Sequence, residues 1–341
     1  MKKIKIKFVG YWEGFDPETQ IIYQILKKHY DVSIVNDDPE YIICTIGGSL
    51  YEYCDYPQVR VLDCGENYTP DFNLVDYAIS RYPIEFQDRN FFMPGCVSSE
   101  TVSSARFASL KEKNRNYDEG IMDEKVYFAS FIASHESENG IRGDFFKKLC
   151  EYKRVESPGT YLNNMPNGEI VRWENDSKPS FQRKCKFSLC FESTKHEGFV
   201  TEKITDAFFS DTIPVYYGSD DVTKIFNPKA FINCSDYNSF EEAIEKIKEL
   251  DSDNQKYLEM LRQPILNNPD YYEELMSGYE AFVCNIFDQP IEKAYRRSRV
   301  YWPHAYDEWI KRQKHAVNAS SSPFGTVIKE IIKRIFRKVK K

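Results

Sequence analysis

Apolar and polar positions change their period repeatedly along the first 250 residues. Residues 3–12 alternate lysine with isoleucine and phenylalanine, as a half-buried strand does, and residues 17–30 repeat apolar side chains at helical spacing. Further short apolar runs follow within residues 31–36, 40–48 and 59–80. Short β-rich runs with helices between them predict a parallel sheet that is covered on both faces.

The same alternation restarts after a polar segment. Residues 109–125 have almost no apolar period, so we predict a linker there. Beyond the linker, strands are predicted within residues 126–134, 186–193, 212–218 and 230–235, and helices within residues 143–153 and 239–250. Ser239 suits the N-cap of the last of these helices, because acidic residues follow it in the first turn.

The chain length sets the number of domains. At 341 residues the chain is too long for one ordinary core and fits two α/β domains in tandem. The predicted division is a first domain at residues 1–115, a second at residues 116–270, C-terminal helices at residues 271–317, and a linker with a basic tail at residues 318–341.

Charge and cysteine usage exclude several classes of protein. The formal net charge is −7, but Pro323 to Lys341 holds seven Lys or Arg and one Glu, a local +6, so the remaining residues sum to −13. An acidic body argues against a polynucleotide partner. The first residues lack the apolar run of a signal peptide, and no run is long enough to span a bilayer. Nine cysteines without a CxxC pair indicate reduced, mostly buried thiols.

The segment from residue 197 to residue 218 has the pattern of a phosphate-binding helix start. Apolar residues at helical spacing predict that a helix begins near Thr201, whose hydroxyl can cap free backbone N–H groups. A strand precedes this helix and another follows it, and such β-α-β units bind anions at the helix N-terminus. Lys203 adds a positive charge there, and Glu202 can accept hydrogen bonds from sugar hydroxyls. The alternative interpretation is a well-capped helix with two solvated charges.

Three blocks of residues resemble the α-1,3-fucosyltransferases of glycosyltransferase family 10, and bacterial members most of all. The first block matches the family signature at Phe191, Glu192, Thr201, Glu202, Lys203, Ile213, Pro214, Tyr216 and Gly218. The second matches the segment of the acceptor-side glutamate at Gly65, Glu66, Asn67, Pro70, Phe72, Asn73, Asp76 and Tyr77. The third resembles the segment of a donor-binding arginine, here Arg142.

The resemblance implies a fold and a reaction. The expected fold is α/β of the GT-B type: two facing Rossmann-like domains with a cleft, the first binding the acceptor and the second GDP-fucose. The expected reaction is an inverting single displacement that moves L-fucose to the 3-hydroxyl, or the 4-hydroxyl, of a GlcNAc unit. The expected acceptor is a glycan such as N-acetyllactosamine or a lipopolysaccharide O-antigen.

The resemblance also assigns roles to individual side chains. Glu66 is the candidate general base, because it follows an apparent strand on a loop; the alternative is a carboxylate that caps the next segment. Arg142 and Lys203 would stabilise the departing diphosphate in place of a metal. Glu202, predicted as a second catalytic-site carboxylate, would bind ribose or fucose hydroxyls.

No cofactor is therefore expected, although Mn²⁺ or Mg²⁺ could stimulate the reaction. The two acidic segments at residues 36–40 and 218–222 are typical of turns and caps, and the alternative is an Asp-rich metal motif.

Further residues of both predicted binding sites carry alternatives. Ser193 and Phe199 stand where bacterial members usually have Asn and Tyr, so two groups that could hydrogen-bond the donor are changed. Asn163 and Asn164 are expected to line the donor pocket, or else to form a plain surface turn. On the acceptor side, the expected contacts are Trp12 and Tyr68, whose rings can pack on sugars, and Asn67.

The C-terminal tail has an amphipathic pattern. Its apolar stripe consists of Ile328, Ile331, Ile332, Ile335, Phe336 and Val339, with lysines and arginines elsewhere. Such a helix can lie in an anionic membrane surface, as the tails of bacterial members suggest, or pack on the body or a second subunit. The expected location is the bacterial cytoplasm, at the inner face of the membrane.

Two other functions stay open. One is a transferase that uses a different nucleotide sugar, and the other is a non-catalytic glycan-binding protein at a membrane surface. A glycosidase is disfavoured, because its paired carboxylates need no phosphate-binding features.

Overall fold

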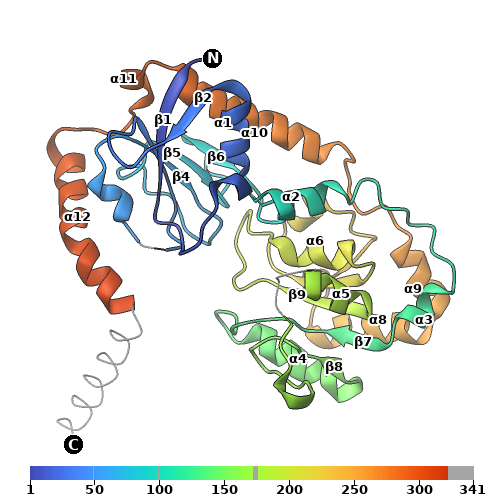
Figure 1. Cartoon of the computed structure of the whole chain (residues 1–341). Helices are drawn as coiled ribbons and strands as arrows, with labels where there is room; N and C mark the ends of the chain where they lie inside the picture. The colour runs from blue at the N-terminus through green and yellow to red at the C-terminus, as the bar shows by residue number, and fades with distance from the viewer. Residues whose placement is uncertain (49, 99, 172–175, 322–341) are drawn as a thin grey trace, which may run out of the picture. The chain divides into compact units, whose positions relative to one another are not determined.

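The chain folds into two α/β units. The computed structural model describes residues 1–48, 50–98, 100–171 and 176–321 (Figure 1). Unit 1 consists of Met1–Phe92 together with the described residues from Gly278 onward, and unit 2 consists of Met93–Ser277. The predicted tail stripe at residues 328–339 lies outside the described residues.

The core of unit 1 is a six-stranded sheet in the order β2-β1-β3-β4-β5-β6, with every neighbouring pair parallel. Its strands are β1 (Lys3–Val9), β2 (Asp31–Ile34), β3 (Tyr41–Cys44), β4 (Val59–Asp63), β5 (Tyr77–Ser80) and β6 (Asn90–Phe92). Strands β3, β4 and β5 are buried along their whole length, as expected for a parallel sheet that is covered on both faces.

Helices from both ends of the chain belong to unit 1. They are η1 (Pro17–Thr19), α1 (Ile21–His29), η2 (Glu52–Asp55), the later part of α10 (Tyr271–Asp288), α11 (Ile291–Ala294) and α12 (Tyr301–Ser321). Helix α12 is fixed to the unit through Asp307, which pairs with the buried guanidinium of Arg60 at 2.7 Å. The linker predicted from residue 318 is wrong for residues 318–321, because α12 continues through them.

Unit 2 repeats the strand order of unit 1 in a five-stranded parallel sheet, β11-β10-β9-β7-β8. Its strands are β7 (Tyr127–Ser130), β8 (Val155–Glu156), β9 (Cys185–Phe191), β10 (Ile213–Tyr217) and β11 (Ile232–Asn233). Its helices are α2 (Thr101–Ala108), α3 (Ile121–Glu124), α4 (Ile141–Tyr152), η3 (Pro166–Gly168), α5 (Ser177–Arg183), α6 (Glu202–Phe209), α7 (Val222–Ile225), η5 (Cys234–Asp236), α8 (Phe240–Ser252), α9 (Asn254–Leu261) and the start of α10. The Ser239 hydroxyl caps α8 at the Glu242 N–H, as predicted.

The predicted linker at residues 109–125 is wrong. Although the segment is mostly polar, Tyr117, Ile121 and Met122 pack against the core of unit 2. The structure consequently divides the chain after Phe92, whereas the predicted boundary follows residue 115. The second division lies after Ser277 rather than after residue 270. Few apolar residues are enough to fix a segment to a core when each of them is well packed.

All nine cysteines are free, and seven of them are buried. Burial raises the pKa of thiols such as Cys54 and Cys185 to about 12, so these groups stay protonated. The prediction that the thiols are mostly buried is confirmed.

Candidate functional site

Arg142 spans the switch point of the unit 2 sheet. In such sheets ligands bind outside the carboxyl ends of the strands where the strand order reverses, which here is between β7 and β9. Arg142, in the first turn of α4, donates from Nη1 to the His135 carbonyl beyond β7 and from Nη2 to the Phe191 carbonyl at the end of β9, both at 2.8 Å. Its Nε is buried and has no hydrogen-bond partner among the described residues. Burial lowers the pKa of Arg142.

A carboxylate holds the start of α4 beside this arginine. Glu136 accepts the backbone N–H groups of Ser137 at 2.7 Å and Gly143 at 3.2 Å, and also the Tyr161 hydroxyl. A Cβ at Gly143 would collide with the Glu136 carboxylate and the Tyr161 hydroxyl, so a side chain there would displace this pair. Burial opposes ionisation of Glu136, but these hydrogen bonds outweigh it and lower its pKa. The sequence did not single out Glu136, because its role depends on contacts made by folding.

A second carboxylate, which is buried, organises the start of α6. Glu192 follows β9, and its side chain is fully buried. It accepts the Thr201 backbone N–H at 2.8 Å, and the Thr201 hydroxyl lies 2.8 and 2.9 Å from its two oxygens. The helix begins where predicted, but the prediction that the hydroxyl caps it is wrong, since α6 has no side-chain cap.

Lys203 completes the network around Glu192. Its Nζ lies 3.0 Å from Glu192 Oε2 and 2.8 Å from Thr201 Oγ1, and 24% of its side chain is exposed. Burial opposes its charge, yet the carboxylates of Glu192 and Glu202 outweigh burial and raise the pKa of Lys203 above its ordinary value. The ammonium group is therefore charged and held in one place.

Glu202 projects from the same turn with two cations nearby. Its Oε1 lies 3.8 Å from the Lys203 Nζ and 3.9 Å from the Lys178 Nζ, and 46% of its side chain is exposed. Burial acts in the opposite direction, but Lys203 and Lys178 lower the pKa of Glu202 to about 2. Lys178, which the sequence did not single out, also pairs with Asp206 at 2.7 Å. Glu202 is thus an ionised and accessible acceptor for hydroxyl groups.

The two departures from the family signature lie in different environments. Ser193 is exposed directly after Glu192, and its carbonyl accepts the Glu138 N–H at 3.0 Å. Phe199 is buried, with its ring centroid 4.8 Å from that of His196. The structure therefore leaves Ser193 accessible to a ligand and keeps Phe199 within the packed interior.

Asn163 and Asn164 use their side chains within their own loop. The Asn163 amide donates to the Gly159 and Glu169 carbonyls at 2.9 Å each. Asn164 accepts the Ser157 N–H and donates to the Val155 carbonyl, both at 2.8 Å. These bonds match the turn alternative.

Glu66 lies exposed at the carboxyl edge of the unit 1 sheet, on the loop that follows β4. Its carbonyl accepts the Tyr68 N–H at 2.8 Å, which tightens the loop, and the buried Arg81 lies beside it with Nε 3.4 Å from the Gly65 carbonyl. Among the described residues, none makes a hydrogen bond or ion pair with the Glu66 carboxylate. It therefore does not cap the next segment.

The neighbours of Glu66 are more tightly held. The Tyr82 hydroxyl donates to Asn67 Oδ1. Tyr68 packs against an apolar cluster that includes Tyr53, and burial raises the pKa of its phenol. Asn67 and Tyr68 lie on the same loop as the candidate base Glu66.

Trp12 lies at the switch point of unit 1, between β1 and β3. Its side chain is 47% exposed, and a Cβ at Gly47 would lie 3.4 Å from the indole. The Gly48 N–H donates to the Gly10 carbonyl at 2.7 Å, and a Cβ at Gly48 would collide with the Tyr11 carbonyl. The close approach of the two loops presents the indole at the edge where such sheets bind ligands.

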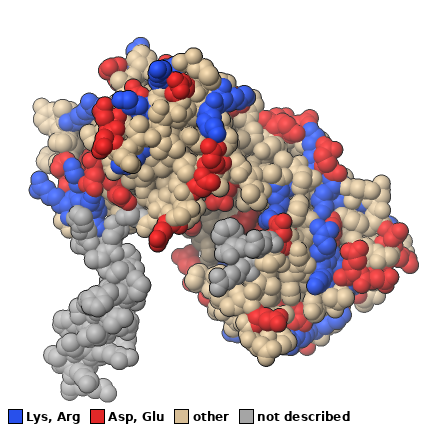
Figure 2. Space-filling view, viewed as in Figure 1, with Lys and Arg blue, Asp and Glu red and all other residues tan. Residues whose placement is uncertain are grey.

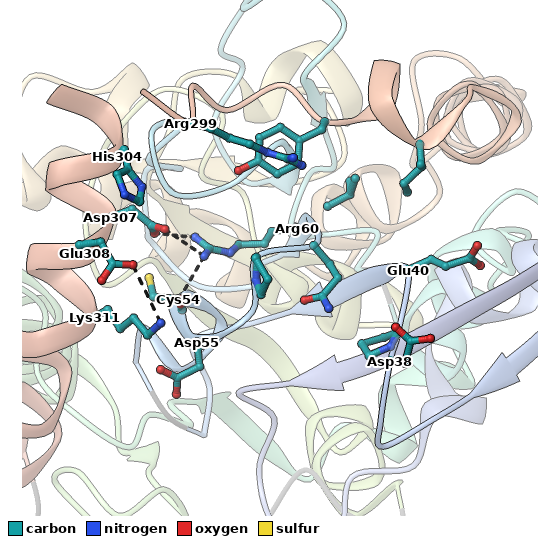
Figure 3. Close-up of a pocket in the computed structure, with 16 residues that line it drawn as sticks. Asp38, Glu40, Cys54, Asp55, Arg60, Arg299, His304, Asp307, Glu308 and Lys311 are labelled. Atoms are coloured by element: carbon teal, nitrogen blue, oxygen red, sulfur yellow. Dashed lines mark hydrogen bonds and ion pairs between the residues drawn. The ribbon is translucent and has the colours of Figure 1, made fainter. Parts of the chain in front are cut away.

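A pocket of about 570 Å³ lies at the opposite, amino edge of the unit 1 sheet (Figure 3). It is lined by residues before β3, by residues before and at the start of β4, and by residues of α11, of α12 and of the segment between these helices. None of the predicted site residues lines it. Asp38 and Glu40 of the acidic segment at residues 36–40 border the pocket, and both contact Lys5. The pocket is therefore unrelated to the two carboxyl edges described above.

Charged groups elsewhere are paired locally. At the start of α7, Asp220 pairs with Lys195 at 2.8 Å and Asp221 with Lys224 at 2.7 Å.

Within the described ranges, no group of three or more His, Cys, Asp or Glu residues has an arrangement suited to a metal ion. In the same ranges, no helix is long and apolar enough to cross a bilayer. Figure 2 shows acidic and basic side chains interspersed over the viewed face.

Comparison with known families gives two matches. Residues 6–97 match the family described as "Alpha-(1,3)-fucosyltransferase FucT N-terminal domain", and residues 122–285 match "Glycosyltransferase family 10 (fucosyltransferase) C-term". Together the two matches contain nearly all the residues described above.

Individual relatives agree with these families. The chain is 34% identical over 308 residues to the α-(1,3)-fucosyltransferase FucT of Helicobacter pylori, a match that covers 80% of this chain and 63% of that protein. It is 33% identical over 102 residues to the human 4-galactosyl-N-acetylglucosaminide 3-α-L-fucosyltransferase 9, covering 29% of this chain and 27% of that protein. The chain thus spans less than two thirds of the length of either relative.

Solved structures extend the similarity to the fold. A crystal structure of an α1,3-fucosyltransferase is similar with a TM-score of 0.69 and 28% identity, covering 88% of this chain and 93% of that one. The structure described as containing GDP-fucose has a TM-score of 0.67, covering 85% and 93%. The predicted α/β class, with Rossmann-like sheets of the GT-B type, is confirmed.

Proposed function

Because the chain belongs to the fucosyltransferases of glycosyltransferase family 10, we propose that it transfers L-fucose from GDP-fucose to a GlcNAc-containing glycan. The donor is supported by the solved relative that contains GDP-fucose. The acceptor is supported by the name of the human relative, which specifies the 3-position of a 4-galactosyl-N-acetylglucosaminide. N-acetyllactosamine is the first acceptor to test, and a lipopolysaccharide O-antigen unit is the second.

The observation that carries the proposal is the charged edge of unit 2. Arg142 has an unsatisfied buried Nε at the switch point, and Lys203 is held with its charge fixed at the start of α6. In the proposed reaction the bond between fucose C1 and the β-phosphate oxygen breaks, and both cations stabilise the charge that develops on the diphosphate. Glu202 accepts hydrogen bonds from ribose or fucose hydroxyls.

Glu66 is the proposed general base of unit 1. It takes the proton from the acceptor hydroxyl as that oxygen bonds to C1 and inverts its configuration. Support comes from its exposure and from the lack of a competing partner for its carboxylate among the described residues. Trp12, Asn67 and Tyr68 are the proposed acceptor contacts, because they occupy the same carboxyl edge.

The proposed reaction needs no metal cofactor. Arg142 and Lys203 supply the positive charge that a divalent cation provides in other nucleotide-sugar sites. Activity that persists in EDTA would support this proposal. Activity that depends on added Mn²⁺ or Mg²⁺ would contradict it.

A contact with an anionic membrane surface, at the inner face of a bacterial cytoplasmic membrane, is proposed for the C-terminal region. Seven basic residues lie between Pro323 and Lys341. On α12, Trp302 and Trp309 are 86% and 55% exposed, seven residues apart and so on one side of the helix. Exposed tryptophans beside basic residues are typical of membrane interfaces.

The test of the function is a transfer assay. The purified chain is incubated with GDP-fucose and N-acetyllactosamine in EDTA, and the product is analysed by mass and by linkage. An α-1,3-linked fucose with release of GDP is expected. A donor other than GDP-fucose is the second candidate, favoured by Ser193, which lies exposed where the family usually has asparagine. Transfer from another nucleotide sugar alone would establish that candidate.

A further inference from the structure

The carboxylate of Glu192 is buried and must be paired and hydrogen-bonded within the protein. Its side chain is fully buried and lies 3.0 Å from the Lys203 Nζ, which is the cation that it contacts among the described residues. A buried carboxylate is costly unless it is paired and hydrogen-bonded. Three hydrogen bonds from Thr201 and Lys203, one of them from a backbone N–H, meet this requirement.

The same network leaves one N–H donor of the Lys203 ammonium group unused. An ammonium group has three N–H donors, and Lys203 uses two of them for Glu192 and for the Thr201 hydroxyl. The third donor makes no hydrogen bond to a described residue: the nearest other carboxylate oxygen, Oε1 of Glu202, lies 3.8 Å from the Nζ, and 24% of the Lys203 side chain is exposed. The two fixed bonds determine where that third bond can point.

The surrounding backbone keeps the network in place. A Cβ at Gly218 would lie 2.6 Å from Glu192 Cγ, so only glycine leaves room for this carboxylate. On the other side, a Cβ at Gly95 would lie 3.2 Å from Thr201 Cα. Close packing on two sides means that Glu192 cannot shift without moving Thr201 and Lys203.

We propose that Glu192 is the positioning residue of the donor site: through Thr201 it fixes the Lys203 ammonium group so that one N–H meets an oxygen of a nucleoside diphosphate. The proposal rests on the proposed function for the identity of the donor, but the geometry of the network does not depend on it. The side chain of Glu192 has no exposed surface and acts on the reaction only through Lys203.

The groups around Lys203 predict how its protonation responds to Glu192. It is faced by Glu192 beyond β9, by Glu202 on its own helix, by Arg142 of α4 and by Lys178 of α5. Both carboxylates raise its pKa, whereas burial and Arg142 lower it. Removing the Glu192 charge leaves Glu202 alone against burial and two cations, so the pKa of Lys203 should fall.

The first test needs no substrate. Acylation of Lys203 by acetic anhydride is followed by mass spectrometry from pH 7 to 11 in the wild type and in Glu192→Gln, with the exposed Lys229 as the internal reference. We expect Lys203 in the variant to become reactive at a pH at least one unit lower than in the wild type, while Lys229 is unchanged. An identical titration in both proteins would overturn the proposal.

The second test separates positioning from stability. Thr205 lies on α6 near the network, and its buried hydroxyl donates to the Cys96 carbonyl at 2.9 Å, so Thr205→Val loosens the same helix without touching Lys203. In the fucosyl-transfer assay, Glu192→Gln should lower kcat/KM by about a hundredfold and shift the alkaline limb of its pH profile downward. Glu192→Asp retains the charge, so its kcat/KM and the alkaline limb of its pH profile should lie between those of the wild type and of Glu192→Gln. An equal loss in Thr205→Val at a matched Tm, with unshifted pH profiles, would reduce Glu192 to a structural role.

These tests distinguish two failures. If the wild type transfers no fucose, the proposed function fails, but the acylation experiment still decides the role of Glu192. If the wild type is active and the Lys203 titration ignores Glu192, the positioning proposal alone fails.

Discussion

The carboxyl edges of the two sheets share one strand order but hold their charged side chains differently. In unit 2, Glu192, Lys203 and Arg142 are fixed by hydrogen bonds and ion pairs within the protein itself. In unit 1, Glu66 lies exposed without a partner among the described residues, and Trp12 is nearly half exposed. A diphosphate needs charges fixed in advance, whereas a base must be free to take a proton. The difference predicts that substitutions at the edge of unit 1 lower turnover without lowering stability. Substitutions at the edge of unit 2 should affect ligand binding and stability together.

The largest expected effect is the loss of turnover in Glu66→Gln. We expect kcat to fall by about a hundredfold or more, because the amide cannot accept the acceptor's proton. Tm and the stabilisation by GDP should stay at wild-type values, since the carboxylate contacts no described side chain. Initial rates and thermal denaturation measure both. The exposed Glu85 of the same unit provides the control Glu85→Gln, and near-normal turnover in Glu66→Gln would remove the base from unit 1.

Lys203→Met should affect stability as well as donor binding. It leaves the buried carboxylate of Glu192 without its contacting cation, so we expect a loss of about 2 kcal/mol or more in the free energy of unfolding. GDP should no longer stabilise the variant. Urea denaturation measures the first effect. The matched control is Lys195→Met, which breaks the exposed pair with Asp220 and should cost about 1 kcal/mol or less. Equal losses in both variants would contradict a prebuilt site.

Trp12→Ala should weaken acceptor binding without changing donor binding. Loss of a sugar contact on an exposed indole is expected to raise the acceptor KM about three- to tenfold. The KM for the donor and the Tm should hardly change. Trp309→Ala, an exposed tryptophan on α12, serves as the comparison in a membrane-free assay. If Trp12→Ala raises the donor KM instead, the division of roles between the two edges is incorrect.

The smallest expected effect is a pH dependence of stability that comes from Glu202. Its pKa is lowered to about 2 in the folded chain by Lys203 and Lys178, against the effect of burial. A lowered carboxyl pKa stabilises the fold above the unfolded pKa, near 4.5, and this stability is lost as pH falls toward 2. The stability difference between wild type and Glu202→Gln should therefore shrink between pH 5 and pH 2.5. Half of this side chain is exposed, so 0.5 M NaCl should weaken the effect, and a salt-independent difference would contradict its origin in ion pairs.

Much of the fold could be predicted from local pattern. The period of apolar residues located most strands of both sheets, and the acidic turn after Ser239 located the start of α8. It missed β6 and β8, which are only three and two residues long. The segment at residues 109–125 could not be placed this way, because three apolar side chains within a polar stretch decide its position through tertiary packing. The same limit explains why the C-terminal helices were not assigned to the first unit.

The candidate site could be predicted in part, residue by residue. The family resemblance identified Arg142, Glu202 and Lys203 as site residues, whereas the helical pattern predicted that the Thr201 hydroxyl caps the helix backbone. A spacing pattern cannot show that this hydroxyl donates to the buried carboxylate of Glu192, nor that its oxygen accepts a hydrogen bond from Lys203 rather than from the helix backbone. For the same reason Glu136 and Lys178 were not singled out, since each acts on residues distant in sequence.

The central claim is that the prebuilt edge of unit 2 is a site for GDP-fucose. The most direct measurement is a thermal-shift titration of the purified chain, without metal, using GDP-fucose, GDP-mannose, UDP-galactose and GDP, repeated on Lys203→Met. We predict that GDP and GDP-fucose alone raise the Tm of the wild type in a concentration-dependent manner, and that neither raises the Tm of the variant. Stabilisation by another nucleotide sugar alone, no response to any of the four, or a response that Lys203→Met retains would contradict the claim.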